Sequence, residues 1–239
     1  MQETAILVVD DDQDIACNVS DILIDAGYRV DIANDGTSAL ELVRKNAYDI
    51  ALLDYCMPDM DGASLYEKIR EIQPSMVAIM ITAYAGHDGV QRAKDAGTWH
   101  VLRKPVDIRR LLGLVQEAAD QPIILVIDDD TEFCNNLWQI LRERGYRVAI
   151  ANSEDEARVK LSDRQYQVVL LDLVLRQMVS TEVFAEIRRQ SPSTATIVIT
   201  GERSRSQAAE EMVADGAECL QYKPLDITTL LNRIDTLVH

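Results

Sequence analysis

The sequence ILVVDDD at residues 6–12 returns almost unchanged as ILVIDDD at residues 124–130. In each copy an apolar run of strand length ends in three consecutive aspartates. The similarity continues outward: AGYRVDIAN at residues 26–34 returns as RGYRVAIAN at residues 144–152, and about 21 of the 49 positions from 6 to 54 are identical. A repeat of this length matches a whole domain rather than a solenoid unit. The sequence therefore predicts two domains, residues 1–120 and 121–239.

Composition limits the classes of function. The net charge of −16 disfavours binding to nucleic acid or to an anionic membrane, and it favours divalent cations and basic partner surfaces. No apolar run is long enough for a membrane span, and no signal peptide begins the chain. We therefore expect a soluble, cytoplasmic protein. Its four cysteines form no C-x-x-C pair and do not recur between the copies, so neither a disulfide framework nor a zinc site is expected.

Apolar runs and amphipathic segments alternate in each copy. Strands are expected at residues 6–9, 28–33, 50–53 and 78–81, with a short fifth strand before a Lys-Pro pair and a last helix at 107–119. The helix after the first strand carries Ile15 where the second copy carries Phe133, on its apolar face. The second copy repeats the pattern, with strands at 146–151, 168–171 and 196–199 and a last helix at 226–238. Such alternation predicts an α/β fold, with two doubly wound domains built on five-stranded parallel sheets.

The polar residues shared by the copies follow the predicted strands. In such sheets, ligands bind beyond the carboxyl ends of the strands, so these side chains should converge on one rim. Three carboxylates cannot all stay charged there without a counter-ion, and Mg²⁺ suits a site of few oxygen ligands. A lysine and a threonine add a charge and a hydroxyl, and the small residues after the threonine, Ala83 and Gly201, let a bulky anion approach. This set suits phosphoryl transfer onto an aspartate.

Each element alone has a simpler explanation. Acids after a strand often cap helices, and a Lys-Pro pair by itself indicates little beyond a cis peptide bond. The ordered combination of an acid pair, an isolated Asp, a Thr before a small residue and a Lys-Pro pair occurs twice, which favours a functional site.

With these motifs, nearly all of both copies resembles the receiver domains of two-component response regulators. The resemblance implies a flavodoxin-like (βα)₅ fold and a role for each matching residue. The phosphoacceptors would be Asp54 and Asp172. The Mg²⁺ ligands would be Asp11, Asp129, the two acceptors and the carbonyls of Cys56 and Val174, with Asp10 and Asp128 supporting through water. The switch hydroxyls would be Thr82 and Thr200, and the phosphate-pairing lysines Lys104 and Lys223.

Two departures from the family pattern stand out. Family members usually carry Tyr or Phe three residues before the lysine, where this chain has Val101 and Leu220. The first copy keeps the familiar MPDMDG loop at residues 57–62, whereas the second has LRQMVS at residues 175–180. A loop without the proline, acids and glycine must be shaped differently. We therefore expect Asp54 to be the better phosphorylation site.

The preferred hypothesis is a signalling protein whose two receivers accept phosphoryl groups from a sensor histidine kinase or a histidine phosphotransfer protein. No segment is expected after the second receiver, so output would be protein–protein contact or phosphate relay, without classical substrate turnover. A homodimer is also compatible with the resemblance.

Three alternatives remain open at this point. The chain is an N-terminal receiver fragment of a longer regulator or hybrid kinase, or an interaction scaffold with a degenerate second receiver, or a phosphohydrolase with an Asp nucleophile. The last usually places its nucleophile after the first strand in a D-x-D-G-T-like run, which DDDQD at residues 10–14 does not match.

Overall fold

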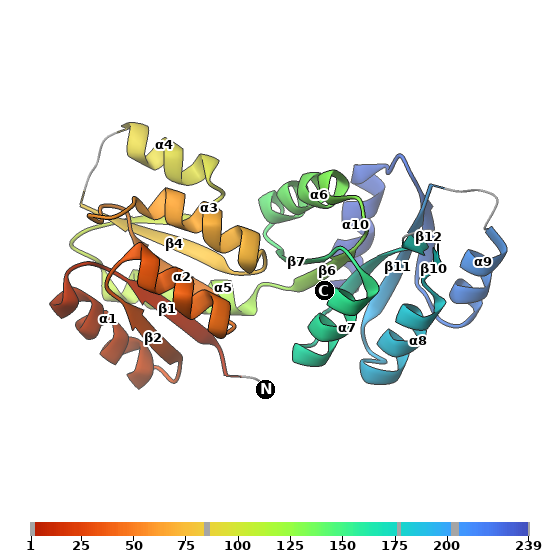
Figure 1. Cartoon of the computed structure of the whole chain (residues 1–239), viewed down its shortest axis with the longest axis horizontal. Helices are drawn as coiled ribbons and strands as arrows, with labels where there is room; N and C mark the ends of the chain where they lie inside the picture. The colour runs from red at the N-terminus through yellow and green to blue at the C-terminus, as the bar shows by residue number, and fades with distance from the viewer. Residues whose placement is uncertain (1–2, 84–86, 176–177, 202–205, 239) are drawn as a thin grey trace. The chain divides into compact units, whose positions relative to one another are not determined.

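The computed structural model describes residues 3–83, 87–175, 178–201 and 206–238. The chain forms two compact units, Met1–Gln121 and Pro122–His239, and Figure 1 shows a sheet flanked by helices in each. Each unit is described by itself.

The first unit is a five-stranded parallel sheet with the order β2-β1-β3-β4-β5. Its strands are β1 (Ala5–Val9), β2 (Arg29–Ala33), β3 (Ile50–Asp54), β4 (Val77–Thr82) and β5 (His100–Arg103). Its helices are α1 (Gln13–Asp25), α2 (Gly36–Lys45), α3 (Gly62–Ile72), α4 (His87–Asp95) and α5 (Ile108–Asp120). The order confirms the predicted doubly wound topology.

The central strands of this sheet are buried on both faces, which explains why they are continuous apolar runs. One core cluster joins the sheet to α2, α3 and α4, for example through Leu40 and Leu65. The other joins it to α1 and α5, for example through Leu23 and Leu111. Helices therefore cover both faces (Figure 1), and the carboxyl ends of the strands are left as the rim where a site can form.

The second unit repeats this sheet, with the order β12-β11-β8-β6-β7. Its strands are β6 (Ile123–Ile127), β7 (Arg147–Ala151), β8 (Val168–Asp172), β11 (Ala195–Thr200) and β12 (Cys219–Tyr222). Its helices are α6 (Thr131–Glu143), α7 (Glu154–Asp163), α8 (Thr181–Gln190), α9 (Ser206–Ala214) and α10 (Ile227–Val238). A two-stranded antiparallel hairpin, β9 (Val174–Leu175) with β10 (Met178–Val179), is an addition that the sequence did not predict.

The ends of the elements differ slightly from the predictions. Asp54 and Asp172 are the last residues of β3 and β8, rather than the residues after them, because they still pair with neighbours on β4 and β11. Tyr28 was predicted to begin a strand, but its N–H donates to the carbonyl of Leu23 and closes α1. Gly27, with φ of 92°, turns the chain there, as expected for a helix-terminating glycine.

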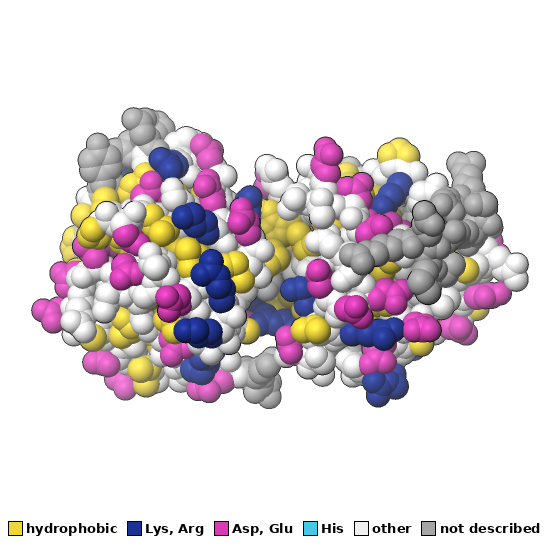
Figure 2. Space-filling view, in the orientation of Figure 1, with side chains coloured by type: hydrophobic (Ala, Val, Ile, Leu, Met, Phe, Trp, Pro, Cys, Tyr) yellow, Lys and Arg dark blue, Asp and Glu magenta, His cyan; other side chains and the backbone are white. Residues whose placement is uncertain are grey.

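Figure 2 shows acidic side chains interspersed with lysines and arginines on the visible face of both units. Ion pairs near the surface include Arg92 with Asp61 at 3.3 Å and Arg158 with Glu182 at 2.9 Å. Exposed pairs of this kind stabilise a fold only slightly. No helix within the described residues has the length and apolar character that crossing a membrane requires.

Candidate functional site

Each unit gathers three carboxylates at the carboxyl edge of its sheet. In the first unit these are Asp10, Asp11 and Asp54, whose ligand oxygens lie within 4.8 Å of one another. Two adjacent strands position them, since β1 leads into the acid pair and pairs with β3, which ends at Asp54. Asp10 and Asp54 are buried, whereas Asp11 is exposed to solvent. The second unit builds the same cluster from Asp128, Asp129 and Asp172.

One lysine joins two of the three carboxylates in each cluster. Lys104 Nζ lies 2.8 Å from Asp10 Oδ2 and 2.8 Å from Asp54 Oδ2. Burial alone would lower the pKa of the Lys104 ammonium, but its hydrogen bonds to the two aspartates raise it, so the lysine stays charged. One ammonium against three carboxylates leaves a surplus of negative charge, which fits a hard divalent cation such as Mg²⁺.

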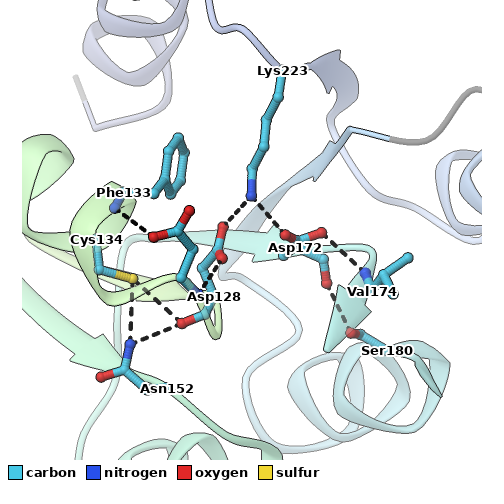
Figure 3. Close-up of polar contacts among 9 residues, drawn as sticks. Asp128, Phe133, Cys134, Asn152, Asp172, Val174, Ser180 and Lys223 are labelled. Atoms are coloured by element: carbon cyan, nitrogen blue, oxygen red, sulfur yellow. Dashed lines mark hydrogen bonds and ion pairs between the residues drawn. The ribbon is translucent and has the colours of Figure 1, made fainter. Parts of the chain in front are cut away.

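The second unit repeats this pairing with shorter contacts (Figure 3). Lys223 Nζ lies 2.6 Å from Asp128 Oδ2 and 2.7 Å from Asp172 Oδ2. Burial raises the pKa of Asp128 to about 6, although the hydrogen bond from Lys223 opposes that rise. The Asp172 carboxylate nearby adds to the rise, because two like charges disfavour ionisation of each other.

In each acceptor candidate, the carboxylate oxygen that does not contact the lysine accepts a hydrogen bond from the main chain. Asp54 Oδ1 accepts a hydrogen bond from the Cys56 N–H at 3.3 Å, and Asp172 Oδ1 accepts one from the Val174 N–H at 3.0 Å. The structure therefore places the main chain of Cys56 and Val174 beside the carboxylates. The use of their carbonyls as metal ligands stays a prediction.

The two threonines that the family resemblance predicts as switch residues end the strands next to the candidate acceptors. Thr82 ends β4 and Thr200 ends β11, and both side chains are buried. The carbonyl of each accepts a hydrogen bond from the main-chain N–H of its lysine, at 2.8 Å in both units. Threonine and lysine are therefore linked through the backbone at one rim. The segments that follow the threonines, from residue 84 and from residue 202, lie outside the described residues.

The positions three residues before the lysines hold Val101 and Leu220, and each packs against a core cluster as a half-buried side chain. The structure thus gives these two residues a packing role.

The loop between acceptor and helix differs between the units. In the first unit Asp61 caps α3, which begins at Gly62, and a Cβ at Gly62 would lie 2.4 Å from the carbonyl oxygen of Asp54. In the second unit the corresponding Ser180 precedes α8, and its buried hydroxyl donates to the carbonyl of Asp172 at 2.8 Å. Where the first unit has a glycine that lets the helix start approach the carbonyl of Asp54, the second unit has a serine whose hydroxyl binds the equivalent carbonyl of Asp172. Arg176 and Gln177 of this loop lie outside the described residues.

Phe133 is a site residue that the sequence analysis missed. It packs against a core cluster, as expected for a residue on an apolar helix face, and the ammonium of Lys223 also lies over its ring, 4.3 Å from the centroid (Figure 3). The available signal was the change from Ile15 to Phe133 at equivalent places, three residues after a capping aspartate.

Comparisons with known proteins agree with this geometry. The family model "Response regulator receiver domain" matches twice, at residues 6–116 and 124–235. A response regulator receiver protein of Anaeromyxobacter sp. (strain Fw109-5) is 33% identical over 231 residues, covering 97% of this chain and 94% of that protein. The sporulation initiation phosphotransferase F of Bacillus subtilis (strain 168) is 32% identical over 117 residues, covering 49% of this chain and 94% of that protein.

Among solved structures, a CheY-like response regulator receiver domain protein from Methanospirillum hungatei JF-1 is 35% identical, with a TM-score of 0.49. It covers 50% of this chain and 95% of that structure's chain. The two matches to the family model span most of the sequence. The chain therefore belongs to the response regulator receiver family and carries two receiver domains of two-component signalling in tandem.

Proposed function

We propose that receiver 1 (residues 1–120) and receiver 2 (residues 121–239) each accept a phosphoryl group from a phosphohistidine donor, on Asp54 and Asp172 respectively. The observation that carries this proposal is the setting of each acceptor. One carboxylate oxygen is bound by the lysine ammonium and the other by a main-chain N–H, at a rim that also holds an acid pair.

The transfer forms one bond and breaks one. A carboxylate oxygen of the aspartate attacks phosphorus, the P–N bond to the donor imidazole breaks, and its electron pair returns to the ring nitrogen. The product is an acyl phosphate whose oxygens carry more negative charge than the free carboxylate. In receiver 1, Lys104 and the Thr82 hydroxyl bind those oxygens, because each gains a charge-assisted hydrogen bond. Lys223 and Thr200 have the same task in receiver 2.

The acid clusters fit Mg²⁺, which supplies neutralisation of the phosphoryl charge when bound. In receiver 1 the ligands would be Asp11, Asp54 and the carbonyl of Cys56, with Asp10 bound through water. In receiver 2 they would be Asp129, Asp172 and the carbonyl of Val174, with Asp128 bound through water.

We further propose a sensor histidine kinase or a histidine phosphotransfer protein as donor, in the cytoplasm, and output through protein contact or phosphate relay without direct binding of nucleic acid. A homodimer and membership of a longer regulator or hybrid kinase are both compatible with the two receivers. The alternative of a degenerate second receiver is disfavoured, because Asp128, Asp172 and Lys223 repeat the contacts of receiver 1. The family also favours an acceptor over a phosphohydrolase.

The direct test is intact-mass measurement after incubation with acetyl phosphate and Mg²⁺. The wild-type protein should gain two phosphoryl groups, Asp54→Asn and Asp172→Asn one each, and the double variant none. Chelation of Mg²⁺ should prevent all incorporation. Asp107→Asn is the matched control, because Asp107 only caps α5 and should leave two phosphoryl groups per chain. Covalent phosphate on the double variant would contradict the proposal.

A further inference from the structure

The two receivers hold their lysines differently. Lys104 has the carboxylates of Asp10 and Asp54, whereas Lys223 has the equivalent pair and also the ring of Phe133. We infer that Phe133 is a positioning residue that fixes Lys223 over the acid cluster and thereby lowers the affinity of receiver 2 for a divalent cation. This inference rests on the proposed function, since it concerns the same metal site.

The backbone presents the two side chains in the same way. The Ile15 N–H donates to Asp12 Oδ1 at 3.2 Å, and the Phe133 N–H donates to Asp130 Oδ1 at 3.0 Å. Both side chains therefore leave the third position of a helix whose start is fixed by an aspartate cap. Within the described part of receiver 1, no aromatic ring lies over Lys104. At this equivalent helix position the two sites thus differ in one side chain, Ile15 in receiver 1 and Phe133 in receiver 2.

The ring completes the surroundings of the Lys223 ammonium. An ammonium has three N–H donors, and Asp128 and Asp172 accept two hydrogen bonds from it. The ring centroid lies 4.3 Å away, well inside the range in which a ring face attracts a cation. The side chain of Lys223 is 24% exposed, so solvent weakens this attraction only in part. Figure 3 shows the ring and the two carboxylates around the end of the lysine.

A divalent cation competes with this arrangement. The ammonium occupies Oδ2 of both Asp128 and Asp172, and Asp172 belongs to the carboxylate cluster that would bind the metal. A cation that enters the cluster repels the ammonium, which must move or share these oxygens. A contact that stabilises the lysine in the metal-free state therefore weakens metal binding by the free energy lost when the lysine moves. From the usual strength of such a cation–ring contact, we expect an effect of about threefold to tenfold on the Mg²⁺ dissociation constant.

The test is a titration of the full chain with MgCl₂, in which amide NMR signals report Mg²⁺ binding. Receiver 1 is silenced by Asp11→Asn and Asp54→Asn, so that only receiver 2 binds the ion. In this background Phe133→Ile and Phe133→Leu should tighten Mg²⁺ binding about threefold to tenfold. Phe133→Tyr keeps the ring face and should leave the affinity unchanged. Equal tightening in the Tyr and Leu variants would show that packing, rather than the ring face, matters, and would overturn the inference.

The reciprocal change is made in receiver 1, in a chain whose second site is silenced by Asp129→Asn and Asp172→Asn. Ile15→Phe should weaken Mg²⁺ binding by a similar factor. The Lys223 ammonium resonance provides a second readout, because loss of the ring current in Phe133→Leu should shift it. If Mg²⁺ binds neither silenced parent, the proposed function fails. If Mg²⁺ binds both parents but substitutions at 133 and 15 change neither the affinity nor the ammonium resonance, this inference alone fails.

Discussion

Gly62 offers a quantitative test of how receiver 1 holds its acceptor. The glycine begins α3 directly behind the acceptor strand. A Cβ added there would lie 2.4 Å from the carbonyl oxygen of Asp54 and 2.7 Å from Met80 Sδ. The methionine end can move aside, but the carbonyl belongs to Asp54, the last residue of β3, which pairs with Ile81 of β4. Gly62→Ala must therefore displace either the helix start or the acceptor residue itself.

The magnitude follows from two opposing terms. Overpacking of a tight interior costs about 1–3 kcal/mol, whereas alanine gains up to about 1 kcal/mol over glycine in a helix. Since the first residue of a helix realises only part of that gain, we expect a net loss of about 1–2 kcal/mol in the free energy of unfolding. With ordinary urea dependence, the unfolding midpoint of receiver 1 should fall by about 0.5–1 M.

The assay is urea unfolding followed by tryptophan fluorescence, because each receiver contains one tryptophan, Trp99 or Trp138. Gly113→Ala is the matched control: nothing lies within 4 Å of a Cβ at this position in α5, so it should be neutral or stabilising. Phosphorylation of Asp54 should also slow in Gly62→Ala, because its acceptor is displaced. If Gly62→Ala unfolds at the same urea concentration as Gly113→Ala, the close approach has no energetic consequence and the reasoning is refuted.

Three further predictions concern the acid clusters. Asp11→Asn should weaken both Mg²⁺ binding and phosphorylation of receiver 1 by at least tenfold, because it removes one direct charged ligand; unchanged Mg²⁺ affinity by NMR titration would exclude that role. Asp54 should take phosphate from acetyl phosphate faster than Asp172, measured as incorporation over time in the Asp172→Asn and Asp54→Asn variants; equal or reversed rates would contradict the difference between the loops. In metal-free protein, Asp128 has a pKa raised from 3.8 to about 6, so folded receiver 2 binds a proton that the unfolded chain has released, and its stability should fall as pH rises through this window. Asp128→Asn should remove this pH-dependent part of the unfolding free energy, measured by urea unfolding at several pH values with Trp138 fluorescence. An unaltered pH profile of stability in the variant would contradict the raised pKa of Asp128.

The fold was predictable because two independent signals coincide in each copy. Apolar runs predict the strands, and the repeat shows which apolar and polar positions the two copies share. The parallel sheets and the buried helix faces follow from these two signals. The ends of elements were less certain, because they depend on pairing between distant residues. Asp54 is a strand residue only because it pairs with Ile81. The β9–β10 hairpin was missed because a two-residue strand has no periodicity to detect.

The site was predictable as a set of residue types, but the contacts within it were not. Carboxylates after neighbouring strands must meet at one rim, so the proximity of Asp10, Asp11 and Asp54 follows from topology. The sequence does not say that Lys104 binds Oδ2 of Asp10 and Asp54 at the same time. Nor does it show that the ring of Phe133, a half-buried aromatic on a helix face, also reaches a lysine at the rim.

The differences between the receivers therefore lie in how shared groups are held. Both keep the carboxylates and the lysine, but receiver 2 adds the Ser180 hydroxyl on the carbonyl of Asp172 and the Phe133 ring on Lys223. Each of these two contacts stabilises the metal-free arrangement of the site. Each therefore increases the free energy needed to rearrange the site around a phosphoryl group and its cation. A receiver that had simply lost its function would be expected to lose buried charges, because unused buried charges are costly. If both aspartates accept phosphate as proposed, the retained charges and the tighter restraints predict that receiver 2 loads after receiver 1 when phosphoryl donor and Mg²⁺ are limiting.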